Sequence, residues 1–117
     1  MAVDMDREPF ELLVTAALDE IPVELTSQLD NVVVLVEDEP PADEPGLLGL
    51  YDGVALTERD TAYGAVLPDR IFVYRRPLLE MCADEAELVE QVRITVVHEI
   101  AHHFGIDDDR LHELGYA

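Results

Sequence analysis

The stretch Val96–Ala117, VVHEIAHHFGIDDDRLHELGYA, holds all four histidines of the chain, three of them within six residues. On a helix, which turns about 100° per residue, His102 lies about 40° from His98, so the two imidazoles share one face, one turn apart. That is the separation two ligands of a tetrahedral zinc ion require. Glu99 lies about 100° from His98, on the flank of the same face. From there its carboxylate can act as a general base toward a water on the metal without being a ligand.

The residues before the histidines predict a long helix that begins after Asp84 and ends near Phe104. Asp84 and Glu87 have capping-box spacing, and Gly105 is typical of the position just past a helix end. Because apolar residues occupy most of the circumference, we expect a largely buried helix. Two histidines on it need partners, since burying an unpaired polar group costs about 1–3 kcal/mol. A metal would supply them, and the alternative is a pair of hydrogen-bonded core histidines. The apolar set is Leu88, Val89, Val92, Ile94, Val96, Val97, Ile100, Ala101 and Phe104.

A third metal ligand is sought after the helix. His103 lies about 140° from His98, off the ligand face, which favours a structural role. Gly105 allows the chain to turn back under the metal, and Asp108, three residues later, is our candidate ligand. The alternatives left open are Asp107, Asp109 and His112.

The remaining sequence predicts a small sheet covered by helices, within a single domain of residues 1–117. Residues 6–22 have the apolar spacing of a helix, with Asp6 as N-cap, Pro9 in the first turn and Pro22 at the end. Strands are expected at 31–38 and 68–76, with a hairpin at 52–53 between them. The acidic, proline-rich residues 37–46 predict a solvated loop, and Pro77 opens a short helix. The stripe of the first helix is Phe10, Leu13, Val14, Ala17 and Leu18.

The composition constrains partners and compartment. The chain has 27 acidic residues against seven basic ones, all arginine, and a formal net charge of −20. Such a surface repels nucleic acid and anionic lipid and favours cationic peptides or protein partners, although it also serves solubility. The single cysteine, Cys82, is expected to be a packed core thiol in a reducing, cytoplasmic compartment. The sequence shows no signal peptide and no apolar run of about 18 residues, so no membrane association is expected.

Three segments together resemble one family: LLGLYDGVALTER (47–59), LPDRIFVYRRPLLE (67–80) and VHEIAHHFGIDDDRLHELGYA (97–117). They are similar to the zincin superfamily, and more closely to the small bacterial zincin-like metallopeptidases, which are short acidic single-domain proteins. The resemblance covers about residues 5 to 117. It implies an α+β, minimal zincin-like fold: a small mixed β-sheet packed with an N-terminal helix and a long active-site helix.

The resemblance also implies a site. Zn²⁺ would be the cofactor, His98 and His102 its ligands and Glu99 the catalytic base. Asp108 stands where metzincins place a third histidine. One strand between residues 47 and 76 would bind substrate as an added strand. Unlike larger zincins, the sequence shows no C-terminal subdomain and no Met-turn, so part of the cleft is expected to be missing or supplied by a partner.

Three functions are compared. The first is a zinc-dependent metallopeptidase-like hydrolase, in which zinc and Glu99 activate water against a peptide carbonyl. The second is a non-catalytic, zinc-stabilised protein-interaction module, which would not need Glu99. The third is a metal-dependent ribonuclease, because small bacterial RNA-processing proteins carry H-G-x-x-H on a similar helix. Glu99 in place of that glycine and the net charge of −20 oppose it. Tyr74, Arg75 and Tyr116 are candidate donors to the oxyanion of the reaction. A structural role is favoured for each of them.

Overall fold

Three strands form one mixed sheet in the order β1-β3-β2. The computed structural model describes residues 3–21, 23, 32–53, 69–106 and 109. In chain order the elements are α1 (Arg7–Asp19), β1 (Val32–Glu37), β2 (Gly49–Asp52), β3 (Asp69–Tyr74), α3 (Arg75–Met81) and α4 (Glu85–His103). The predicted α+β fold, a small mixed sheet with an N-terminal helix and a long motif-bearing helix, is confirmed.

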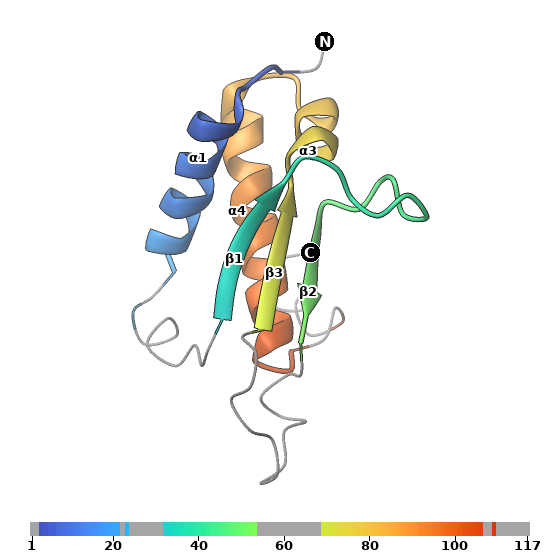
Figure 1. Ribbon diagram of the computed structural model, residues 1–117. Coiled ribbons are helices and arrows are strands. Elements are labelled where there is room, and N and C mark those ends of the chain that lie inside the picture. The colour runs from blue at the N-terminus through green and yellow to red at the C-terminus, as the bar shows by residue number, and fades with distance from the viewer. Residues whose placement is uncertain (1–2, 22, 24–31, 54–68, 107–108, 110–117) are drawn as a thin grey trace, which may run out of the picture.

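The central strand β3 is paired on both sides. β1 runs parallel to it, with Val34 opposite Ile71. β2 runs antiparallel to it, with Tyr51 also opposite Ile71. Helices α1 and α4 lie on one face of this sheet (Figure 1). Because side chains alternate along a strand, the odd-numbered residues of β3 face these helices.

The core lies between that face of the sheet and the two helices. Its fully buried members come from α1, β3, α3 and α4, since each element contributes one apolar stripe or face. Cys82 belongs to this core at 1 % exposure, and burial raises the pKa of its thiol, as expected of a packed rather than reactive cysteine. The core includes Phe10, Val14, Ile71, Val73, Leu78, Leu88, Val92 and Val96.

The helix starts follow the sequence signals with one correction. Asp6 and Asp84 are the N-cap residues of α1 and α4, but only Asp84 accepts a side-chain bond, from the Glu87 N–H at 2.8 Å. The strand predicted over 68–76 ends at Tyr74, and α3 begins at Arg75 instead of Pro77. Pro77 therefore lies within the first helical turn, where its missing N–H costs nothing.

Two further expectations need adjustment. Val89 is 46 % exposed, so α4 is not buried all round. β2 ends at Asp52, at the predicted hairpin turn, and its described partner is β3. The second strand of the predicted hairpin lies outside the described residues. Pro22, the predicted end of the first helix, also lies outside them.

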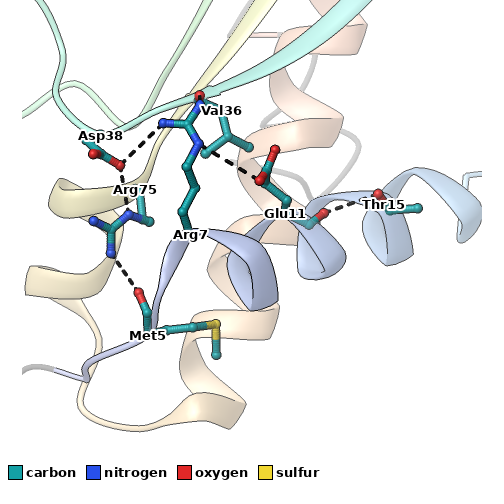
Figure 2. A network of polar contacts seen from close by, with 7 residues as sticks. All are labelled: Met5, Arg7, Glu11, Thr15, Val36, Asp38 and Arg75. Carbon is teal, nitrogen blue, oxygen red and sulfur yellow. Dashed lines mark hydrogen bonds and ion pairs between the residues drawn. The ribbon is translucent and has the colours of Figure 1, made fainter.

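An ion-pair network holds the N-terminal segment against the end of the sheet (Figure 2). Asp38, just after β1, accepts a hydrogen bond from Arg75 Nε at 2.9 Å and lies 3.7 Å from Arg7 Nη1. Arg75 also donates to the Met5 carbonyl at 2.6 Å, and Arg7 donates to the Val36 carbonyl. Arg75 is thus engaged in holding the fold, which agrees with its expected structural role.

Candidate metal centre

Helix α4 brings His98, Glu99 and His102 together. One ligand atom from each lies within 4.8 Å of the others, and the two imidazole ring centroids are 4.6 Å apart. His98 and His102 are half-buried, whereas the Glu99 side chain is 8 % exposed. The expectation that His98 and His102 are buried with the helix is therefore wrong. They line an accessible face, and the carboxylate beside them is the buried group.

Glu99 is enclosed because β2 crosses α4 at close range. A Cβ atom added at Gly49 would lie 2.7 Å from Thr95 Cγ2 and 3.2 Å from Glu99 Cγ, so only glycine permits this approach. Burial raises the pKa of the Glu99 carboxyl. His102, His98 and a hydrogen bond from the Tyr51 backbone N–H oppose that rise. Its Oε1 lies 3.3 Å from His102 Nδ1.

The end of α4 turns the chain sharply beside the histidines. Gly105 has φ of 80°, its N–H donates to the His102 carbonyl at 3.0 Å, and the Ile106 N–H donates to the Ala101 carbonyl at 2.9 Å. These two bonds define a Schellman motif and confirm Gly105 as the residue past the helix end. Asp108, Asp107 and His112 lie outside the described residues. Asp109 is described and exposed, and within the described part of the chain it does not join the ligand group.

His103 faces away from this group and is fully buried. Its Nδ1 lies 3.1 Å from Asp69 Oδ2, and the same carboxylate oxygen accepts a 2.6 Å hydrogen bond from the Tyr51 hydroxyl. The expectation that His103 lies off the ligand face and serves the structure agrees with this geometry.

Sequence reasoning missed Tyr51, Asp69 and Gly49. Asp69 carried a usable signal, because it occupies the same side of the predicted strand as Ile71 and Val73 and would therefore be a buried acid in need of donors. Tyr51 and Gly49 reach α4 only through the β2–β3 register, which no local pattern specifies.

The donor set fits Zn²⁺. Two imidazoles one turn apart, both reachable from solvent, suit bonds of about 2.0–2.1 Å, and they leave room for a further ligand and water.

Known proteins share both this sequence pattern and this fold. The model of the zincin-like metallopeptidase family matches residues 29–116, and the chain belongs to that family. A conserved hypothetical protein from Thermus thermophilus has a similar structure, with a TM-score of 0.62 and 27 % sequence identity. The match covers 86 % of this chain and 94 % of that one. No curated protein matches the chain.

Family membership agrees with a metal-binding, hydrolase-like function that depends on zinc. None of the described helices is both long and apolar enough to cross a membrane.

Proposed function

We propose that this protein is a zinc-dependent peptidase in which His98 and His102 hold the ion and Glu99 is the general base. The observation that carries the proposal is a buried carboxylate beside two accessible imidazoles, on a helix whose sequence belongs to the zincin-like family. Asp108 is proposed as the third protein ligand. When bound, zinc lowers the pKa of water and polarises a substrate carbonyl.

Glu99 takes the proton from the attacking water and passes it to the leaving amine. Burial, the cause of its raised pKa, makes it a better proton acceptor than an exposed carboxylate and a competent donor afterwards. The Tyr51 N–H holds the carboxylate on the β2 side of the site. A residue with its orientation fixed by the fold needs no reorganisation during the reaction.

Strand β2 is the proposed docking edge for an extended peptide. β3 is excluded, because it is already paired on both sides. The Tyr74 N–H donates to the Leu48 carbonyl, so by the antiparallel alternation Leu50 also bonds to β3, while the Gly49 backbone groups point away from β3 toward the outer edge. A peptide strand added there would pass Glu99.

The net charge of −20 favours cationic peptides or proteins as substrates and disfavours nucleic acid. A partner that completes the cleft and a cytoplasmic location remain part of the proposal.

Glu99→Gln tests the base. It preserves shape and should keep about one zinc per chain while hydrolysis of a peptide library falls on the order of 10²-fold or more. Metal content is measured by atomic emission and cleavage by mass spectrometry. The His98→Ala variant, expected to lose metal, is the control. Undiminished cleavage by Glu99→Gln would exclude Glu99 as base, and a wild-type protein that binds zinc but cleaves nothing would favour the interaction-module alternative.

A further inference from the structure

A buried polar network joins the motif helix to the sheet next to Glu99. Asp69 on β3 is 2 % exposed and His103 on α4 is 0 % exposed. The Tyr51 hydroxyl of β2 donates to Asp69 Oδ2 at 2.6 Å, and His103 Nδ1 lies 3.1 Å from the same oxygen. Three elements thus meet on one oxygen atom.

Tyr51 links this network to the candidate base. Its side chain is held by Asp69, with His103 Nδ1 3.5 Å from the hydroxyl, while its backbone N–H donates to the Glu99 carboxylate. The Tyr51 side chain is therefore held by the network, and its backbone N–H is held by Glu99. Displacing the ring would also displace the N–H.

Strand β2 and the residue after it pack closely against both α4 and Asp69. A Cβ atom at Gly53 would lie 2.4 Å from Asp69 Cγ, and one at Gly49 would lie 2.7 Å from Thr95 Cγ2. Asp69 thus contacts the strand through both the Tyr51 hydroxyl and the Gly53 backbone. Buried charged groups of this kind often add little stability compared with apolar residues, so their contribution is better sought in the placement of neighbouring groups.

We propose that Asp69, His103 and Tyr51 form a positioning unit that holds the Tyr51 N–H on Glu99 and so fixes the orientation of the base. The inference rests on the proposed role of Glu99. None of the three residues is proposed to touch substrate or metal. Asp69 and His103 act by holding Tyr51, and Tyr51 acts through its N–H on Glu99. A purely structural network would support folding alone.

Two conservative variants separate these roles. Tyr51→Phe keeps the ring and removes the hydroxyl, and Asp69→Asn keeps the volume and removes the charge. We expect the residue-51 amide, followed by hydrogen exchange on uniformly ¹⁵N-labelled protein, to exchange about tenfold faster or more. We expect kcat to fall about tenfold with KM and zinc content unchanged, because outer partners of a site contribute 10–100-fold.

Asp38→Asn is the matched control, because it also removes a carboxylate that anchors the fold, but through Arg75 and Arg7 at the other end of the sheet. It should leave both the residue-51 amide and kcat unchanged.

The outcomes are distinct. A folded Tyr51→Phe protein with wild-type amide exchange, or with wild-type kcat, overturns the positioning role. A wild-type protein that cleaves no peptide overturns the proposed function instead, while the amide measurement still reports whether the network holds the Tyr51–Glu99 contact. If Asp69→Asn fails to fold, Tyr51→Phe decides alone.

Discussion

Asp108, which follows the turn at Gly105, is the proposed third metal ligand. The Gly105 and Ile106 N–H groups donate to the His102 and Ala101 carbonyls, so the chain changes direction directly after α4. We expect Asp108→Ala to weaken zinc binding by more than the about 10–100-fold typical of an outer partner, because a direct ligand is lost. Competition with a chromophoric chelator measures the affinity.

The alternatives to Asp108 serve as controls in the same measurement. Asp107→Ala and Asp109→Ala should bind zinc as the wild type does, and so should His112→Ala. Weaker binding in His112→Ala, with Asp108→Ala unaffected, would assign the third ligand to His112.

The sequence predicted the local part of this site and not the rest. His98, Glu99 and His102 share a helix, so their angular positions follow from spacing alone. Asp69 and Tyr51 are 34 and 52 positions from His103, and they meet it only through strand pairing. The degree of burial was also misjudged, because helical angles locate a face without showing what covers it.

Strand β2 crosses α4 at close range beside Glu99, and this crossing fixes where the Glu99 side chain lies. Gly49→Ala would force a Cβ atom into Thr95 and the Glu99 stem, so we expect a loss of about 1–3 kcal/mol in the free energy of unfolding. Urea denaturation measures it. Gly46→Ala is the matched control, because nothing lies within 4 Å of a Cβ atom there, and its stability should equal or slightly exceed the wild type. Equal losses in the two variants would contradict the close crossing.

Element boundaries show where sequence signals compete. Asp84 and Gly105 bound α4 through caps that involve near neighbours, and both were predicted. β3 was predicted to continue through Arg75 and Arg76, because alternation persists there, yet Arg75 opens α3 and bonds to Asp38. Tertiary ion pairing overrode a local pattern.

At the scale of the whole molecule, the Asp38 network fastens the N-terminal segment to the sheet. The hydrogen bond from Arg75, aided by the charges of Arg75, Arg7 and Arg76, holds the pKa of Asp38 below its ordinary value of 3.8. A group with a lowered folded-state pKa stabilises the fold above its unfolded pKa and loses that effect as pH falls through the folded value.

We therefore expect Asp38→Asn to lower Tm modestly at neutral pH, because the pair is partly exposed. The difference from wild type should shrink below pH 3.8 and then vanish. Thermal unfolding followed by circular dichroism across pH measures it. Asp43→Asn, which changes the net charge equally in an exposed loop, is the control. A difference that grows on acidification would contradict the network.

The fold class followed from the order of helical and extended patterns, whereas the strand order did not. The parallel pairing of β1 with β3 joins Val32 to Asp69 across a long intervening segment, and local hydrophobic patterns carry no information on such partners. A single domain over residues 1–117 stays a prediction.

Gly49, Tyr51 and Gly53, the residue just after β2, face α4 and Asp69, and their spacing permits only one register of the strand there. A slip by one residue would press Leu50 and Asp52 against the helix, and a slip by two would put the Tyr51 ring where only a hydrogen fits. Because this register is fixed, a peptide paired with β2 could shift along it only in steps of two residues relative to Glu99. The lengths of the cleavage products would then differ by multiples of two residues.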